Sequence, residues 1–232
     1  MTTTNKKTNV KSTDLILRHY TNYSALKGIL NNGLKFSNGL ASQNSWDDQN
    51  DVELLKFFHD TKSLIPYTFS FTKKYSIHHW EYYGNNTKLT TDIDKVKCCI
   101  VFYENKIKDA IYEFNNNSDS DRITLEDIKY YWISEMKGIK FNVNKLPFIK
   151  RKGFYVDDEI RLLLLSNKEE DKYLPNIISC IKSILFYKSN DFSIIKQELT
   201  THYGLVSSQL KESTLCYGTE WLNEVKTNTI NK

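Results

Sequence analysis

The segment FYVDDEIRLLLLS, from Phe154 to Ser166, predicts a buried β-strand with a polar stripe along one side. Successive side chains of a strand point to opposite faces of the sheet. Asp157, Glu159 and Arg161 would therefore share one face, and apolar side chains would cover most of the other. One explanation is an edge strand, where exposed charges oppose aggregation. The other is a carboxylate that the fold holds at a strand end for a chemical purpose.

The composition is that of an ordinary folded protein. The chain has 232 residues, of which 40% are hydrophobic, so it is long enough for one large core. Its 32 Lys and Arg residues against 28 Asp and Glu residues give a net charge of +4. This charge permits a nucleic-acid partner without requiring one. The nearest feature to a basic run is KRKGF from Lys150, which we interpret as a solvated loop.

The four cysteines do not indicate a metal site. Cys98, Cys99, Cys180 and Cys216 form no C-x-x-C pair and have no histidine at ligand spacing. The adjacent pair Cys98 and Cys99 is interpreted as small buried hydrophobic residues. The polar N-terminus lacks the apolar centre of a secretory signal, and no apolar run approaches membrane-spanning length. A soluble cytoplasmic protein without membrane association is expected.

The hydrophobic periodicity predicts an α+β fold with one domain at residues 14–224, a disordered tail at 1–13 and a second tail at 225–232. Strands are predicted at LILRHYT from Leu15, LKFSN from Leu34, YTFSFTK from Tyr67, VKCCIVFY from Val96, IKSILFY from Ile181 and GLVSSQL from Gly204. Helices are predicted at TNYSALKGILNNGL from Thr21, VELLKFFHD from Val52, TLEDIKYYWISEM from Thr124 and DFSIIKQELTTHY from Asp191.

Three short motifs occur in an order that resembles a bacterial family known as domain of unknown function twenty-nine seventy-one. The first motif is RHYT before a helix, which contains His19. The second is FSFT, which contains Ser70 and precedes a tryptophan and several tyrosines. The third is DDEIR, which contains Glu159. The match spans residues 15–210, and the family's Asn-Asp-Pro turn corresponds to NDV at Asn50–Val52.

This family is in turn similar to the ADP-ribosyltransferases, whose split-sheet fold binds NAD between two small sheets. The resemblance implies an ADP-ribosyltransferase-like split β-sheet core with short flanking helices. It also implies that NAD is the substrate and that no metal takes part. By position, His19 matches the strand histidine of that fold and Glu159 its late glutamate, so both would face one cleft from facing strands.

The resemblance implies roles for the residues around this pair. Asp157 would orient the acceptor, and Arg161 would hold Glu159 by a charge-assisted bond. An aromatic ring that stacks on nicotinamide would come from the segment YSIHHWEYYGNN, in which His78 and His79 receive no role and lie in a polar loop. The implied NAD-binding residues are His19, Tyr20, Thr21, Ser70, Thr72, Tyr75, Trp80 and Tyr83, with Tyr82 as an alternative tyrosine.

The chemistry of NAD cleavage suits these residue types. Breaking the bond between nicotinamide and ribose develops an oxocarbenium-like positive charge, which a fixed carboxylate stabilises. The leading expectation is an NAD-dependent ADP-ribosyltransferase that modifies nucleic acid or protein, as a bacterial toxin or antiphage defence effector with a cognate antitoxin or complex partner. One alternative is an NAD glycohydrolase, in which water replaces the acceptor. The other is a catalytically inactive module that binds a nucleotide or a partner protein.

Overall fold

Strand β9 (Glu159–Ser166) lies inside the central sheet and has hydrogen-bonded neighbours on both sides. It pairs antiparallel with β4 (Ile65–Thr72) along one edge and with β6 (Arg122–Asp127) along the other. The edge-strand explanation of its charges is therefore wrong. Ile160, Leu162 and Leu164 join the main hydrophobic core, whereas Leu163 and Leu165, on the other face of β9, belong to a smaller cluster with Ile128 and Phe148.

The strand begins at Glu159, later than predicted. Residues Lys152–Asp157 form a 3-10 helix, and Asp158 has a left-handed backbone with φ of 46°. Asp157 therefore precedes the strand and does not belong to its alternating pattern. Glu159 and Arg161 do share a face of β9, as predicted. Their side chains lie on the same side of the strand and are hydrogen-bonded to each other.

The computed structural model describes residues 15–40, 48–83, 89, 91–213 and 215. The two predicted tails and Cys216 lie outside the described residues. Within the described part of the chain, no helix is both long enough and apolar enough to cross a membrane.

The described strands form one eight-stranded sheet and two small two-stranded sheets. The order in the large sheet is β12-β11-β5-β1-β4-β9-β6, with β3 beside β4, and all its pairs are antiparallel except β11 with β12. The remaining strands of this sheet are β1 (Ile16–Asn22), β3 (Ser37–Asn38), β5 (Lys97–Tyr103), β11 (Ile181–Phe186) and β12 (Leu210–Glu212). The small sheets pair β2 (Leu34–Lys35) with β10 (Tyr173–Leu174) and β7 (Lys129–Tyr131) with β8 (Ile149–Arg151).

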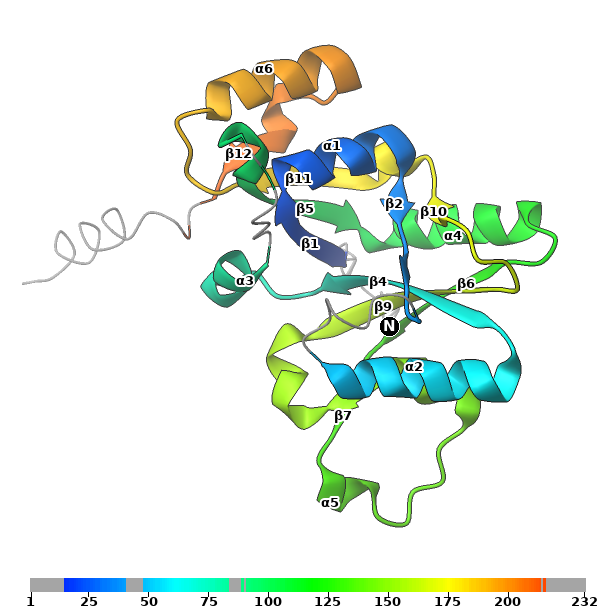
Figure 1. The fold of residues 1–232 in the computed structure, drawn as a ribbon. Coiled ribbons are helices and arrows are strands. Elements are labelled where there is room, and N and C mark those ends of the chain that lie inside the picture. The colour runs from blue at the N-terminus through cyan, green and yellow to red at the C-terminus, as the bar shows by residue number, and fades with distance from the viewer. Residues whose placement is uncertain (1–14, 41–47, 84–88, 90, 214, 216–232) are drawn as a thin grey trace, which may run out of the picture.

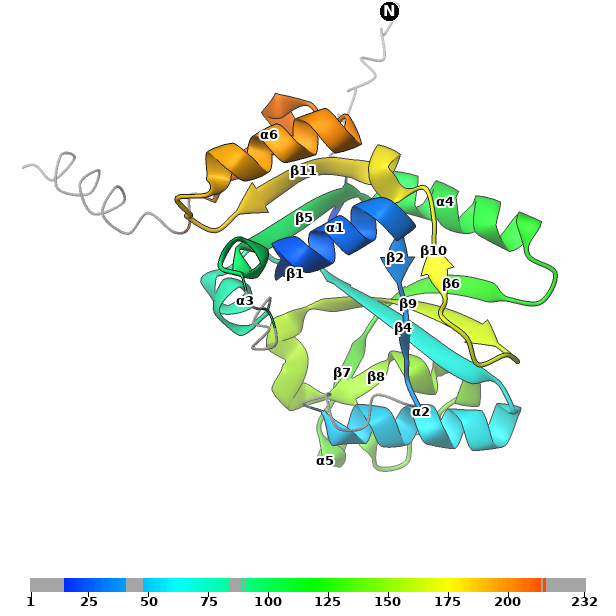
Figure 2. The same ribbon diagram turned by 45° about the horizontal axis from the view of Figure 1, so that its top comes forward.

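The large sheet is joined weakly at its middle. Strands β1 and β4 pair at one position, Arg18 opposite Thr72, whereas β4 pairs with β9 along its whole length. The two halves consequently diverge, with β1 and β5 on one side and β4 and β9 on the other (Figure 2). The prediction of an α+β fold is confirmed, and the central sheet is mostly antiparallel. In place of two separate sheets, the structure has one sheet whose halves meet at this junction.

Helices cover the two halves separately (Figure 1). Helices α1 (Tyr23–Asn32) and α6 (Phe192–Tyr203) lie over the half that contains β5 and β11, and α2 (Gln49–Lys62) lies beside the other half. The other helices are α3 (Ile77–Tyr82), α4 (Glu104–Asn117) and α5 (Ile133–Met136), with 3-10 segments at Ile93–Lys95, Val143–Phe148, Ile177–Cys180 and Ser207–Gln209.

Two regions differ from the prediction. The prediction of a helix from Thr124 is wrong, because this segment forms strands β6 and β7 and only a short α5. Pairing of β6 with the already buried β9 overrides the local helical spacing. Helix α4, which was not predicted, buries Ile107 and Ile111 at positions i and i+4. The final strand is shorter than predicted, since Ser207–Gln209 form a 3-10 helix before β12.

Replacing Gly33 with alanine should destabilise the fold. Gly33 ends α1 with φ of 93°, and an added Cβ would lie 2.2 Å from the backbone carbonyl oxygen of Leu174 in β10. We expect Gly33→Ala to lower the free energy of unfolding by more than about 1 kcal/mol, measured by urea denaturation. Gly28→Ala is the matched control, because a Cβ at Gly28 in the same helix meets no atom within 4 Å and should stabilise by roughly 0.5–1 kcal/mol. Equal stability of Gly33→Ala and the parent would contradict this account.

Candidate functional site

A cavity of about 770 Å³ lies where β1 and β4 separate, and both halves of the sheet line it. His19 reaches it from β1, Ser70 from β4 and Glu159 from β9, and α1 contributes another part of the wall. The structure therefore brings the predicted histidine and the predicted glutamate to one cavity. Tyr20 and Thr72 also line it.

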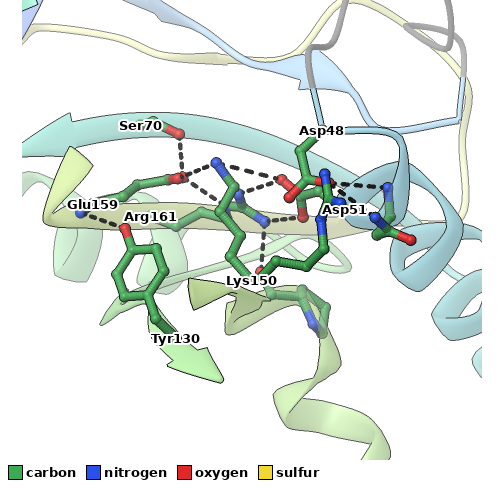
Figure 3. Close-up of polar contacts among 10 residues, drawn as sticks. Asp48, Asp51, Ser70, Tyr130, Lys150, Glu159 and Arg161 are labelled. Atoms are coloured by element: carbon green, nitrogen blue, oxygen red, sulfur yellow. Dashed lines mark hydrogen bonds and ion pairs between the residues drawn. The ribbon is translucent and has the colours of Figure 1, made fainter. Parts of the chain in front are cut away.

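Glu159 is buried, and three side chains hold its carboxylate (Figure 3). Its Oε1 accepts hydrogen bonds from Ser70 Oγ at 2.5 Å and from Arg161 Nε at 2.8 Å. Its Oε2 lies 2.7 Å from Lys150 Nζ. The backbone N–H of Glu159 donates to the Tyr130 hydroxyl at 3.0 Å. The contact that was predicted between Arg161 and Glu159 is thus present.

Arg161 is bound on its other side by Asp51 from α2. Its Nη1 donates to Asp51 Oδ1 at 2.8 Å and its Nη2 to Asp51 Oδ2 at 2.6 Å. Nη1 also donates to the carbonyl oxygen of Pro147 at 2.7 Å. A bidentate pair of this kind restricts the plane of the guanidinium group as well as balancing its charge.

Two cations and two anions together form what we call the ion cluster: Asp51, Lys150, Glu159 and Arg161. Lys150 Nζ also lies 3.8 Å from Asp51 Oδ2, so each cation faces both anions. The side chains of Asp51 and Arg161 are both only 2% exposed. Buried charges are costly unless they are paired, and the ion cluster is formally neutral.

The ion cluster sets the ionisation of Glu159. Burial alone would raise the pKa of this carboxyl group, because its charged form loses hydration. The charges and hydrogen bonds of Arg161 and Lys150 outweigh that effect and lower the pKa of Glu159 to about 2. Glu159 therefore carries a full negative charge at neutral pH while it lines the cavity.

His19 faces the same cavity with a defined tautomer. Its Nδ1 lies 3.0 Å from the backbone carbonyl oxygen of Ser70, which can only accept, so Nδ1 carries the proton. Burial lowers the pKa of His19 to about 4, so the ring is neutral at neutral pH and Nε2 is an acceptor. The ring packs against Phe69, with centroids 4.4 Å apart. Ser70 thus contacts both His19 and Glu159.

The segment predicted as an aromatic loop contains helix α3, which turns His79 into the cavity wall. His79 is 1% exposed, and its ring stacks on Tyr20 and Tyr83. Its Nε2 lies 3.4 Å from the carbonyl oxygen of Asp157, and its Nδ1 lies 2.5 Å from Ser76 Oγ. The prediction of a polar loop at His79 is wrong, because Ser76 caps the helix and directs this ring inward.

Tyr83 and Asp157 lie together on this wall of the cavity. The Tyr83 hydroxyl interacts with the Asp157 carboxylate. Burial raises the pKa of Asp157, although the charge of Lys150 opposes the shift. Tyr82 and His78 also line the cavity, so the region offers two tyrosine rings to a ligand.

Three residues that the resemblance implied for NAD binding do not line the cavity. Trp80 is 1% exposed and belongs to a second core cluster, against which Tyr75 packs. The Tyr75 hydroxyl is 2.6 Å from Ser213 Oγ, and Thr21 is buried near the end of β1. Helical spacing explains the difference in α3, because residues 79, 82 and 83 share a face from which Trp80 is rotated by about 100°.

Two members of the ion cluster were missed in the sequence. The prediction of a solvated loop at Lys150 is wrong. Lys150 lies on β8, and its side chain is only 12% exposed. Asp51, where the resemblance implied an Asn-Asp-Pro turn, belongs to the first turn of α2. A signal for it existed, since Asp51, Leu55 and Phe58 follow the i, i+4, i+7 spacing of a buried helix face.

Comparison with known proteins adds no family to this geometry. No protein-family model matches the chain, and no match was found among curated proteins or solved structures. Among the described residues, no group of three or more His, Cys, Asp or Glu side chains is placed to hold a metal ion. A functional assignment therefore depends on the chemistry of the cavity itself.

The free energy of unfolding should decrease as the pH falls from 7 to 5, in part through His19. The pKa of His19 is about 4 in the folded protein against 6.5 ordinarily, so the unfolded chain binds the proton first. Above pH 6.5 His19 is neutral in both states and does not reduce the free energy of unfolding. Below this pH its protonation in the unfolded chain lowers that free energy, by up to about 2 kcal/mol at pH 5.

Urea denaturation of parent and His19→Gln proteins at both pH values measures this contribution. His19→Gln should flatten the pH dependence, whereas the same change at the exposed His202 should preserve it. An unchanged pH dependence in His19→Gln would refute the assignment of a neutral His19 with a depressed pKa.

Proposed function

We propose that this protein is an NAD-dependent ADP-ribosyltransferase in which Glu159 stabilises the ribosyl cation. The observation that carries the proposal is an ionised, buried carboxylate on the wall of a cavity of about 770 Å³ that also contains a neutral histidine. Cavities of roughly 300–1,000 Å³ accommodate small-molecule ligands and cofactors.

The proposed reaction breaks the bond between nicotinamide and C1′ of its ribose, and the bonding electron pair leaves with nicotinamide. The sugar then develops an oxocarbenium-like positive charge, as in glycoside cleavage. A preorganised charge that faces this centre lowers the barrier, by about 3–4 kcal/mol for one such group. Glu159 suits this role because its partners hold it in place before any ligand binds.

Glu159 retains capacity for a hydrogen bond from the substrate. An ionised carboxylate can accept about four hydrogen bonds. Ser70, Arg161 and Lys150 supply three donors, two of them to Oε1 and one to Oε2. The remaining position on Oε2 is suited to a hydroxyl of the nicotinamide ribose.

The other cavity residues have complementary roles in this proposal. His19 would accept a hydrogen bond at Nε2 from a second ribose hydroxyl. The ring of Tyr83 or Tyr82 would stack on nicotinamide. Asp157, whose pKa is raised by burial, would act as general base for the acceptor nucleophile. After attack on C1′, the proton of that nucleophile passes to the Asp157 carboxylate.

Two other functions use the same cavity. An NAD glycohydrolase would follow the same steps with water as the nucleophile. In a nucleotide-binding module, the ion cluster would have a structural role only, which its neutrality also permits. A nucleic-acid or protein acceptor, and an effector role as toxin or antiphage protein, rest on the family resemblance alone.

Replacing Glu159 with glutamine should reduce NAD turnover by roughly 100-fold or more, because it removes one electrostatic stabiliser of the transition state. NAD binding should fall much less, since the ribosyl charge develops only during bond cleavage. Purified parent and Glu159→Gln proteins would be assayed for release of nicotinamide. The variant leaves Arg161 and Lys150 partly unbalanced, at a cost of about 3–5 kcal/mol in stability, so its folded fraction must be measured under assay conditions.

Glu126→Gln is the matched control, because Glu126 lies opposite Arg161 in the neighbouring strand β6 and pairs with the exposed Lys145. It should consume NAD at the parent rate. Free ADP-ribose as the product would identify a glycohydrolase, and ADP-ribose bound to an acceptor would identify a transferase. A folded Glu159→Gln protein that turns NAD over at the parent rate would eliminate the catalytic role of Glu159.

A further inference from the structure

We propose that Asp51 is a positioning residue for Glu159 and acts on it through Arg161. The proposal rests on the function proposed for Glu159, and it extends the machinery to helix α2, outside the strands that carry the histidine and the glutamate. Asp51 borders the cavity, but it is 2% exposed and both of its oxygens bind Arg161, so it would act through Arg161 and not on the reacting atoms. Its effect would be on the orientation of Arg161 and on the charge around the cavity.

Arg161 contacts both carboxylates with different edges of one planar group. Its Nε edge meets Glu159 Oε1, and its Nη1 and Nη2 atoms meet the two oxygens of Asp51. Among the hydrogen bonds described, the loss of Asp51 leaves Nη1 with the carbonyl oxygen of Pro147 and leaves Nη2 without an acceptor. The guanidinium plane would then be less restrained, and the Nε donor would move relative to Glu159.

Packing alone does not account for a carboxylate at this position. Asp51 occupies the buried face of α2 together with Leu55 and Phe58, where an apolar side chain would satisfy the helix. The carboxylate is 2% exposed, and both of its oxygens bind Arg161. The carboxylate of Asp51 thus restrains Arg161, and through Arg161 it restrains Glu159.

Asp51 also balances the charge of the site. With both anions the ion cluster is neutral, and without Asp51 it carries an excess positive charge from Arg161 and Lys150. The excess charge would lie beside the place where the ribosyl cation develops, and it would oppose that development. The loss of Asp51 should therefore reduce kcat more than it affects KM.

Kinetics of Asp51→Asn with NAD would test this expectation. We expect kcat to fall by about 10-fold or more, with KM within about 3-fold of the parent value. A second variant, Asp51→Asn with Arg161→Met, removes one charge of each sign and leaves Glu159 paired with Lys150. It should fold without an unbalanced buried charge, yet kcat should remain low because Arg161 no longer holds Glu159.

Asp121→Asn is the matched control for a general loss of stability. Asp121 pairs with the buried Lys172 at 2.7 Å, and neither residue lines the cavity. The control should therefore be destabilised like Asp51→Asn and retain the kcat of the parent. If either folded Asp51 variant has the kcat of the parent, the positioning role is overturned.

A readout without substrate separates this proposal from the proposed function. In a ¹H–¹⁵N NMR spectrum of the full chain, the Arg161 Nε–H signal, assigned by its absence in Arg161→Lys, should be protected from solvent exchange in the parent. Protection should be lost in Asp51→Asn and retained in Asp121→Asn. Retention of protection in Asp51→Asn overturns the positioning role whether or not NAD is consumed. Loss of protection in a protein that consumes no NAD supports the positioning role and overturns the proposed NAD chemistry.

Discussion

The buried guanidinium group of Arg161 is the interaction on which the site depends. It joins β9 to α2 through Asp51 and to the 3-10 segment at Val143–Phe148 through Pro147. A desolvated arginine must be fully paired, so these segments have to be in place together. The same requirement brings Lys150 of β8 to the second oxygen of Glu159 and keeps this carboxylate ionised inside the protein.

The weak junction between β1 and β4 is the second constraint, because it provides the space that the charged residues face. On the edge of β4 away from β9, β1 pairs only at Thr72, and β3 pairs at Tyr67 and Thr68. The carbonyl oxygen of Ser70 is therefore available to His19, while the Ser70 hydroxyl binds Glu159. Pairing of β1 with β4 along their full lengths would bring the two halves together and close the cavity between them. The short pairing of β1 with β4 thus leaves space for the cavity, and Glu159 presents an ionised carboxylate to it.

Much of the fold could be predicted where local periodicity and tertiary packing agree. Strand β1, helix α1 and the apolar face of β9 follow directly from the spacing of their apolar residues. Prediction failed at Thr124–Met136, where helical spacing was overridden by the hydrogen bonds of β6 to β9. It also failed at Trp80, which packs in a core cluster. The sequence of a short helix does not show whether an aromatic side chain points into the core or into a cavity. The rotation of α3 decides between them, and that rotation depends on its packing.

The sequence by itself determined that Glu159 and Arg161 share one face of a strand, because alternation depends only on the local backbone. The order of His19, Ser70 and Glu159 along the chain was also evident. Only the tertiary structure decided that the charged face is buried, that Asp51 pairs with an arginine 110 residues away, and that Lys150 completes the ion cluster. The physical reason is that periodicity sets the direction of a side chain relative to its own backbone. Ionisation and burial instead depend on partners that are close in space and distant in sequence.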